Sequence, residues 1–407
     1  MRLTDEQQAM LDGTRGWPMQ VAMRLLVAVG RALDADGLVP VASVHLSLSG
    51  VSVGEPGRRF YEDLVARGGR FVVPTTLNVL SLDRREGGRD PALAANESKQ
   101  LAIVRACEAM GGTPIYTCNP FLHGVVPRAG ESVAWNESAT APYVNGVLGA
   151  RTNREGATAL ASALTGFTAR YGMHVDSARR GGIGIEVATP VEGSDAFAVL
   201  GGAVGRIAGA RVPVLGGLAR VPTFDEYTAF CAAYAAVGPG AIFHIVGMTP
   251  EAPDRLPPGP EGGAPARIDA QVLAREVRAH STARGERVDV VAVGCPHASI
   301  EQLREIVACV GGRRVHAGTR FVVQTSAATA RAAEEEGIGH ALREAGVTLT
   351  ADTCVHIAYR QAPAGAVLAT NSLKIAYLTG SHDVGVRFGP LAACVDAATS
   401  GRWTAAS

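Results

Sequence analysis

The sequence predicts an α/β fold in which parallel sheets are covered by helices. The first observation is an alternation of short apolar runs with helical patterns in the last third of the chain: strands at 288–293, 320–324 and 347–349, and helices at 300–310 and 327–345. Such alternation is typical of parallel strands joined by helical crossovers. The second is composition, because 49 glycines and only 5% aromatic residues suit many tight turns between strands and helices. The third is size, since 407 residues that are 47% hydrophobic can bury a substantial core.

The earlier elements follow the same pattern. Pro18 suits the first turn of a helix, where its missing N–H would have no partner, and apolar residues at helical spacing continue to Leu33. After this helix we expect, in chain order, a strand at 38–44, a small-residue loop at 46–54, a helix at 60–66, a strand at 70–73, a helix at 97–110 and a strand at 114–116. A helix that includes Asn145 follows.

The middle of the chain continues this alternation up to a segment rich in proline. The predicted elements are a strand at 183–187, helices at 195–207 and 224–236, and strands at 212–215 and 241–246. The segment 249–266 then contains six prolines, a density that no helix or central strand tolerates. We therefore expect a surface loop there, and with it a subdivision of the chain.

Charge and hydropathy exclude several classes of partner. The 38 basic and 38 acidic residues cancel, so we expect no general attraction to nucleic acid or to a membrane. The first twelve residues are polar and charged, unlike a signal peptide, and the apolar segment 21–33 is interrupted by Arg24 and Arg31 and is too short to span a bilayer. A cytoplasmic protein is the expectation.

The seven cysteines divide into two groups. No CxxC pair occurs, and in a reducing compartment metal or catalytic use is favoured over disulfides. Four cysteines lie in predicted helices or in an apolar segment, where a thiol usually fills the core: Cys107, Cys231, Cys309 and Cys394. Three follow predicted strands and are flanked by polar or turn residues: Cys118, Cys295 and Cys354.

The three strand-end cysteines suggest a shared site. Open α/β sheets bind ligands at the carboxyl ends of their strands, so these thiols could meet at one point. Three thiolates can hold an iron–sulfur cluster and leave one iron without a protein ligand, and such an iron is a Lewis acid for a substrate hydroxyl. Two alternatives stay open: three separate structural cysteines, or a hydrolase in which Cys295 is the nucleophile and His297 its base.

Short polar groups follow other predicted strands. The turn at 50–52 could bind an anion through successive N–H groups or be an ordinary turn. Glu137 and Ser138 could bind substrate or cap a helix, and Lys374 could be a plain surface lysine. Further polar residues near predicted strand ends, none at zinc-motif spacing, are Thr75, Thr76, Asn78, His45, His123, His244 and His297.

Nine segments, in order, extend over nearly the whole chain: SGVS at 49–52, PTTLN at 74–78, TPIYTCNP at 113–120, AWNES at 134–138, GARTNR at 149–154, GMTPEA at 247–252, GCPH at 294–297, DTC at 352–354 and TNSLK at 370–374. Together they resemble the large subunit of aconitase X, a divergent branch of the aconitase superfamily. The resemblance implies an aconitase-like fold with several intertwined α/β subdomains and makes residues 1–407 one catalytic region.

The resemblance also implies an activity and a site. Members of this family are dehydratases, hydro-lyases that remove water from a β-hydroxy carboxylate with an iron–sulfur cluster; whether this is 2Fe-2S, 3Fe-4S or 4Fe-4S is left open. The cluster ligands would be Cys118, Cys295 and Cys354. The substrate-binding residues would be Gly50, Val51, Ser52, Asn78, Glu137, Ser138 and Lys374, with Lys374, Glu137 and Ser138 as the catalytic candidates.

Partner and substrate follow from the same resemblance. The family has a small swivelling domain, fused or separate, and this chain resembles the type that has a separate small subunit. The family's known substrates are cis-3-hydroxy-L-proline and mevalonate 5-phosphate. Val79 stands where phosphomevalonate members have proline, and Cys118-Asn119-Pro120-Phe121 replaces the more usual Cys-Thr-Pro-Tyr. These departures favour dehydration of hydroxyproline to Δ1-pyrroline-2-carboxylate. The alternatives are phosphomevalonate, a related hydroxy acid, or a non-catalytic iron–sulfur or thiol-based binding protein.

Overall fold

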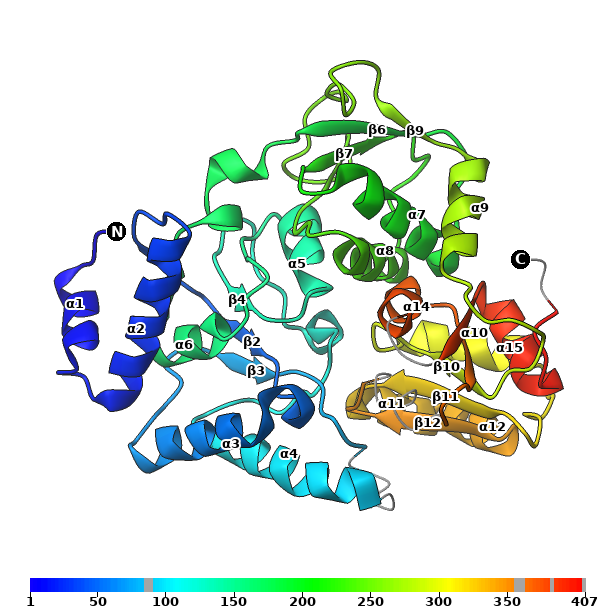
Figure 1. Cartoon of the computed structure of the whole chain (residues 1–407), viewed down its shortest axis with the longest axis horizontal. Helices are drawn as coiled ribbons and strands as arrows, with labels where there is room; N and C mark the ends of the chain where they lie inside the picture. Colours follow the sequence, from blue (N-terminus) through cyan, green and yellow to red (C-terminus); the bar gives the residue numbers. More distant parts are fainter. Residues whose placement is uncertain (84–90, 355–362, 381–383, 405–407) are drawn as a thin grey trace. The chain divides into compact units, whose positions relative to one another are not determined.

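The computed structural model describes residues 1–83, 91–354, 363–380 and 384–404, and the chain divides into two compact units (Figure 1). Unit 1 takes its residues from Met1–Leu82, Glu86–Arg180 and Thr249–Glu251, and unit 2 takes its residues from Asp83–Arg85, Gly181–Met248 and Ala252–Ser407. In the described part of the chain no helix has the length and hydropathy to cross a bilayer.

Unit 1 is built around a three-stranded parallel sheet in the order β3-β2-β4. Its strands are β2 (Val44–Leu46), β3 (Thr75–Leu77) and β4 (Ala134–Trp135), and all of their side chains are buried. A single bridge between Thr76 and Thr113 places the segment that leads to Cys118 beside β3, also in parallel. Because all these segments run in one direction, their carboxyl ends lie at one edge of the sheet.

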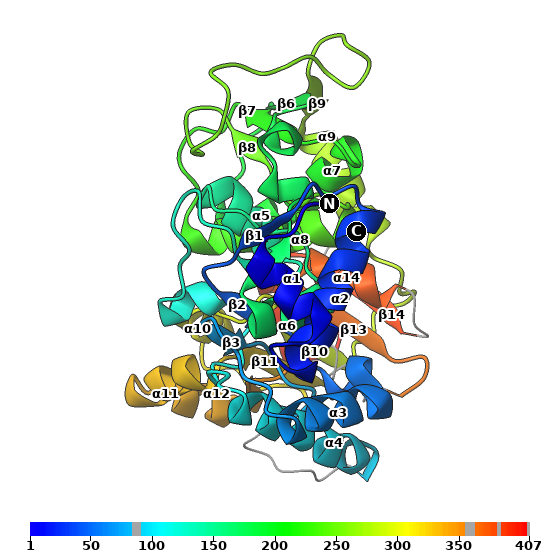
Figure 2. The same cartoon turned by 90° about the vertical axis from the view of Figure 1, so that its left-hand side faces the viewer.

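The helices of unit 1 bury this sheet in one hydrophobic core. Leu26, Leu64 and Leu77 are fully buried members of it. Figures 1 and 2 show α3 and α4 side by side. The helices are α1 (Asp5–Asp12), α2 (Trp17–Ala32), α3 (Gly50–Ala66), α4 (Pro91–Ala109), α5 (Thr140–Pro142), the π-helical η2 (Tyr143–Val147), α6 (Thr158–Thr165) and the 3-10 helices η1 (Pro120–His123), η3 (Gly172–His174) and η4 (Asp176–Arg179). Strands β1 (Leu38–Pro40) and β5 (Phe167–Ala169) form a separate antiparallel pair.

An ion pair between the buried Arg179 and the more exposed Glu251 explains why Thr249–Glu251 belongs to unit 1. The guanidinium of Arg179, whose side chain is 1% exposed, donates through Nε to both carboxylate oxygens of Glu251, at 2.8 and 3.1 Å. Arg179 also donates to the side-chain oxygen of Asn145 at 2.8 Å and to its backbone oxygen at 3.1 Å. The ion pair therefore connects Thr249–Glu251, which comes later in the sequence, to Arg179 near the end of the main part of unit 1.

Unit 2 contains a five-stranded parallel sheet in the order β12-β11-β10-β13-β14. In the central strand β10, Val291 and Val293 pack into one buried cluster, whereas Val290 and Ala292 pack into another. Both faces of the sheet are therefore covered, as is usual for parallel sheets. Its strands are β10 (Val290–Val293), β11 (Arg320–Thr325), β12 (Val347–Ala351), β13 (Val367–Thr370) and β14 (Gly385–Phe388), and its helices are α10 (Ile300–Val310), α11 (Ala327–Glu335), α12 (Ile338–Glu344), α14 (Leu373–Thr379) and α15 (Leu391–Ser400).

A second parallel sheet of unit 2 has the order β8-β7-β6-β9. Helices α7 and α8 cross closely because Gly201 has no side chain: a Cβ there would meet the backbone oxygen of Phe230 at 2.3 Å. The elements are β6 (Ile183–Val187), α7 (Gly193–Ala208), β7 (Pro213–Gly216), α8 (Phe224–Val237), β8 (His244–Ile245), β9 (Ala266–Ile268) and α9 (Ala270–Ala279).

The predicted parallel α/β fold is confirmed, and unit 2 matches the sequence analysis most closely. The strand at 183–187 and the helix at 300–310 coincide with β6 and α10. The segment 249–265 contains no helix or strand, as its prolines predict, while its role as a subdivision stays a prediction. One helix was predicted as too long: Gly337, at φ 77°, separates α11 from α12 within 327–345. The strand predicted at 241–246 is only the two-residue β8.

Several predictions for unit 1 were wrong. No strand forms at 70–73, because Phe71 N and Val72 N donate to Met110 and Ala163 instead of to a neighbouring strand. No strand forms at 114–116 either, because Tyr116 turns the backbone to φ 41°. The predicted strand at 38–44 is divided between β1 and β2, and the predicted loop at 46–54 contains the start of α3. The helix predicted at 97–110 begins earlier, as α4.

Candidate active site

Three predicted substrate-binding residues meet at the carboxyl edge of the unit 1 sheet. Asn78 follows β3, and Glu137 and Ser138 follow β4. Asn78 Nδ2 donates to Glu137 Oε2 at 3.2 Å, while Ser138 Oγ and the backbone N of Ala139 donate to Glu137 Oε1 at 3.4 and 3.3 Å. The carboxylate of Glu137 is therefore held by three donors, in the half-buried position that a substrate-binding group needs.

His45 connects this edge to the Cys118 loop. It lies in β2, is fully buried, and its Nδ1 is 2.9 Å from Thr76 Oγ1 while its Nε2 is 3.0 Å from the backbone oxygen of Thr117. Burial lowers the pKa of His45 to about 4, against the opposing effect of the nearby Glu137 carboxylate. At neutral pH His45 is thus uncharged. From the sequence, only the position of His45 near a strand end is apparent, and no role for it follows.

The turn at Gly50–Ser52 is the first turn of α3. The side chain of Gln100 accepts from Gly50 N at 2.8 Å and from Ser81 N at 3.0 Å, and it donates to Leu48 O at 2.9 Å. Ser52 N donates to Ser49 O at 3.0 Å, and Val51 lies between them in the helix. Two of the three amides proposed for anion binding are thus engaged within the protein, which favours an ordinary helix start at these positions.

Cys295, Cys354 and Lys374 lie in unit 2, all at the carboxyl edge of the five-stranded sheet. Cys295 follows β10 after Gly294, Cys354 follows β12 after Asp352 and Thr353, and Lys374 is the second residue of α14, which follows β13. The buried His297 places Nε2 2.7 Å from the backbone oxygen of Thr353 and so connects the β10 loop to the β12 loop. The structure therefore holds the loops of two predicted ligands together within unit 2.

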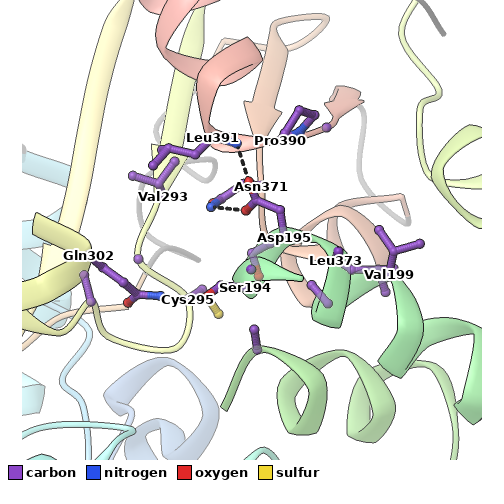
Figure 3. Close-up of a pocket in the computed structure, with 18 of the residues that line it drawn as sticks. Ser194, Asp195, Val199, Val293, Cys295, Gln302, Asn371, Leu373, Pro390 and Leu391 are labelled. Carbon is purple, nitrogen blue, oxygen red and sulfur yellow. Dashed lines mark hydrogen bonds between the residues drawn. The ribbon is translucent and has the colours of Figure 1, made fainter. Parts of the chain in front are cut away.

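Cys295 also lines a cavity of about 510 Å³ in unit 2 (Figure 3). Asp195 accepts from Asn371 Nδ2 at 2.9 Å and from Leu391 N at 2.7 Å, as the dashed lines show. Burial raises the pKa of Asp195. Glu192 and Glu305 line the same cavity, and the described lining residues include no lysine, arginine or histidine. The cavity is therefore acidic.

The remaining cysteines match the prediction of core residues in three cases. Cys107, Cys231 and Cys394 are fully buried, and burial raises the pKa of each thiol, so these sulfurs stay protonated. Cys309 is half-buried in α10. By contrast Cys118, Cys295 and Cys354 are all partly accessible and all lie at loops.

The surroundings of the predicted ligands fit an inorganic cluster. Among residues 1–83, 91–354, 363–380 and 384–404, no group of three His, Cys, Asp or Glu side chains that could hold a metal ion occurs. Cys118 belongs to unit 1 and the other two cysteines belong to unit 2, so their sharing of one cluster stays a prediction. Asn119 Oδ1 and Thr353 Oγ1, each adjacent to a predicted ligand, are buried without a hydrogen-bond partner. Buried polar atoms are normally paired, and the sulfides of a cluster accept hydrogen bonds, from the Thr353 hydroxyl or from the Asn119 amide after exchange of its O and N positions.

Proteins of known activity with similar sequences define the class. The phosphomevalonate dehydratase large subunit of Methanothermobacter thermautotrophicus is 36% identical over 92% of this chain and 93% of its own length. The cis-3-hydroxy-L-proline dehydratase of Pseudomonas aeruginosa is also 36% identical, over 98% of this chain and 70% of its own length. With these relatives over most of its length, the chain is a hydro-lyase, an enzyme that removes water from its substrate.

The family follows from two further comparisons. The sequence patterns that define the first, second and third domains of aconitase X match residues 1–177, 181–278 and 288–400. The crystal structure of Thermococcus kodakaraensis aconitase X in its holo form superimposes with a TM-score of 0.86 at 28% identity, covering 98% of this chain and 100% of that one. The chain belongs to the aconitase X family, which confirms the resemblance seen in its nine sequence segments.

Proposed function

We propose that this chain is the large subunit of an iron–sulfur dehydratase that converts cis-3-hydroxy-L-proline to Δ1-pyrroline-2-carboxylate. Membership of the aconitase X family supports the reaction class. The acidic cavity beside Cys295 is the observation that supports this substrate. Hydroxyproline carries an ammonium group that carboxylates attract, whereas the phosphate of mevalonate 5-phosphate would be repelled by them.

In this proposal Cys118, Cys295 and Cys354 hold the cluster. The two buried polar atoms next to Cys118 and Cys354 that have no partner support the fit. When bound, a cluster with one iron that lacks a protein ligand supplies a Lewis acid for the leaving hydroxyl.

The chain's own residues bind the substrate and move the proton. Glu137, oriented by Asn78, accepts the proton next to the substrate carboxylate, and the Ser138 hydroxyl at 3.4 Å from Glu137 Oε1 relays it to the departing hydroxyl, which leaves as water. Lys374 stabilises the substrate carboxylate as charge develops on it. On α3 the backbone N–H groups of Gly50 and Ser52 already donate to Gln100 and Ser49. The exposed Ser52 side chain is therefore the polar group that contacts the substrate. The enamine that forms tautomerises to the product without further help from the protein.

Dehydration of mevalonate 5-phosphate is the second candidate. It is favoured by the Methanothermobacter thermautotrophicus relative, which has the same 36% identity as the hydroxyproline enzyme. That relative and the one from Aeropyrum pernix are both named large subunits, and this chain covers 93% and 98% of their lengths. We therefore propose a separate small swivel-domain subunit as the partner under either substrate.

The test is anaerobic co-purification of the chain with its small subunit, followed by assays with both substrates. We expect brown protein that releases Δ1-pyrroline-2-carboxylate from cis-3-hydroxy-L-proline and leaves mevalonate 5-phosphate unchanged. Turnover of mevalonate 5-phosphate alone would reverse the choice of substrate. Colourless protein that binds no iron after reconstitution would reject the cofactor.

Two substitutions refine this test. Glu305→Gln removes one carboxylate of the cavity and should raise KM for hydroxyproline about threefold at low salt, with less effect at high salt. Glu137→Gln should lower kcat by at least about a hundredfold, the range for loss of a proton-transfer group. Glu131→Gln, whose carboxylate accepts from the backbone N of Arg128 in the same unit, is the matched control and should leave kcat unchanged.

A further inference from the structure

The loops that carry Cys118 and Cys354 are built in the same way. In each, a buried threonine precedes the cysteine, and a non-glycine residue at positive φ precedes the threonine: Tyr116 at φ 41° and Asp352 at φ 63°. Only Asp34 shares this conformation among the non-glycine residues of the described chain. Such backbone is unfavourable for most side chains and persists where the surroundings impose it, often at functional sites.

A buried histidine contacts each of these turns at the same atom. His45 Nε2 lies 3.0 Å from the backbone oxygen of Thr117, and His297 Nε2 lies 2.7 Å from that of Thr353. The two histidines are 0% and 2% exposed. A carbonyl oxygen only accepts, so each Nε2 carries the hydrogen. For His45 this leaves Nδ1 as an acceptor, which matches the Thr76 hydroxyl at 2.9 Å.

Other protein contacts fix the positive-φ residues from the opposite side. The Tyr116 hydroxyl donates to Glu108 Oε1 at 2.5 Å. Asp352 Oδ1 accepts from Ala327 N at 2.7 Å, and Asp352 N donates to Thr325 O at 3.0 Å. Each turn is therefore held between a histidine and a second anchor, all within its own unit.

We propose that His45 and His297 are positioning residues that hold Cys118 and Cys354 in their ligand conformations before a cluster is bound. The identity of the bound group rests on the proposed function, whereas the bracing of the turns does not. Pre-organised ligands lose less freedom on binding, so loss of one brace should weaken iron binding and loosen one cysteine loop only.

The variants use the geometry of the amide side chains. In His45→Gln and His297→Gln the longer amide places an N–H near the position of Nε2, whereas in His45→Asn and His297→Asn the amide reaches only as far as Nδ1. The Gln variants should therefore keep the brace that the Asn variants lose. His174→Asn and His280→Asn are matched controls, because these buried histidines contact Ser132 and Glu276 instead of a cysteine turn.

Two readouts separate the brace from the cofactor. In metal-free protein, mass spectrometry gives the rate at which iodoacetamide labels each cysteine; after anaerobic reconstitution, iron content and the visible spectrum report the cluster. We expect His45→Asn to change Cys118 labelling by roughly three- to tenfold and leave Cys354 unchanged, with the reverse for His297→Asn. Iron affinity should fall about 10- to 100-fold in both, with recovery in the Gln variants.

The outcomes are distinguishable. Labelling that is unchanged in both Asn variants, or changed equally in the controls, overturns the proposal. Local changes in labelling in a chain that never binds iron support the brace and reject the cluster. If an Asn variant does not fold, Thr76→Val keeps the side-chain shape and removes the donor to His45 Nδ1. Thr76→Val should change the iodoacetamide labelling rate of Cys118 and leave that of Cys354 unchanged. An unchanged rate at Cys118 counts against the proposal that His45 braces its turn.

Discussion

Unit 1 and unit 2 present polar residues at the carboxyl edge of a parallel sheet, but they support that edge differently. The strands of the unit 1 sheet have two or three residues, whereas those of the five-stranded sheet in unit 2 have four to six. In unit 1 the short strands form few backbone hydrogen bonds with one another. Buried side chains, above all Gln100 and His45, instead form hydrogen bonds with backbone N–H and C=O groups at this edge. In unit 2 the longer strands form longer ladders, and side chains such as His297 and Asp352 brace the loops that follow them. Single polar substitutions should therefore affect unit 1 more.

The largest expected effects come from substitutions of the predicted cluster ligands, and they should be equal in the two units. Cys118→Ser in unit 1 and Cys354→Ser in unit 2 should each lower iron content and turnover by about a hundredfold or more, because a hydroxyl replaces a thiolate ligand. Iron analysis, the visible spectrum and turnover measure this. Cys309→Ser, in α10, is the control and should keep its iron. Loss of iron in only one ligand variant would mean that the units do not share a site.

The next effect should distinguish the units. Gln100→Leu leaves three buried backbone groups unpaired and should lower the free energy of unfolding of unit 1 by about 3 kcal/mol or more. Gln302→Leu removes one capping contact in unit 2 and should cost about 1 kcal/mol. Urea titrations measure unit 1 in a Trp403→Phe background, where Trp17 and Trp135 supply the fluorescence, and unit 2 in a background with Trp17→Phe and Trp135→Phe, where Trp403 supplies it. Equal costs would refute the contrast between the units.

Lowering the pH should weaken the hydrogen bonds of the Glu226 carboxylate in unit 2. The Gln100 amide in unit 1 does not titrate, so its hydrogen bonds should not change. The Arg220 guanidinium and the N–H groups of Thr223 and Gly193 lower the pKa of Glu226 to about 2, against an unperturbed value of 4.5. The folded state thus holds the ionised form, so its stabilisation is complete above pH 4.5 and is lost as the pH falls toward 2.

Glu226→Gln should therefore cost roughly 1–2 kcal/mol at pH 7, after allowance for the exposed Arg220, and almost nothing at pH 2. The cost of Gln100→Leu should be independent of pH over the same range, because an amide does not titrate. Urea titrations at several pH values measure both. A cost for Glu226→Gln that persists at pH 2 would show that packing, and not charge, carries its role.

The smallest single effect should come from the exposed member of a matched pair of helix caps. Thr4 in unit 1 and Ser299 in unit 2 both form reciprocal capping boxes, with Gln7 and Gln302. Thr4 is exposed, whereas Ser299 is buried and also donates to Asp225 at 2.8 Å. Thr4→Ala should cost about 0.5 kcal/mol and Ser299→Ala about 1.5 kcal/mol, measured by thermal unfolding. The opposite order would show that burial does not set the strength of these caps.

The same contrast explains which parts of the fold could be predicted. In unit 2, β6 and α10 follow from their patterns, because β6 is a short run of mostly apolar residues and α10 repeats apolar residues at helical spacing. In unit 1 the strand expected at 70–73 does not exist, since its N–H groups bond to a helix end and to α6. Partners so distant in sequence leave no local pattern.

Some residues of the candidate site can likewise be predicted from the sequence, and others cannot. Cys118, Cys295 and Cys354 stand out because a thiol beside turn residues is unusual. Gln100 does not, because it lies inside a helical pattern and its partners lie some twenty to fifty residues away. From the sequence, His45 had only its position at a strand end, and His297 had such a position and a possible role as a base for Cys295, whereas their contacts with the threonine carbonyls required coordinates.

The ion pair of Arg179 and Glu251 has a consequence for synthesis of the chain. Until Glu251 leaves the ribosome, the Arg179 guanidinium, whose side chain is 1% exposed in the folded chain, lacks the carboxylate that accepts from its Nε. The amino-terminal unit therefore matures only after much of the next unit has been translated. A fragment that stops at residue 180 should remain incompletely folded, and adding a short peptide that spans 249–251 should restore it.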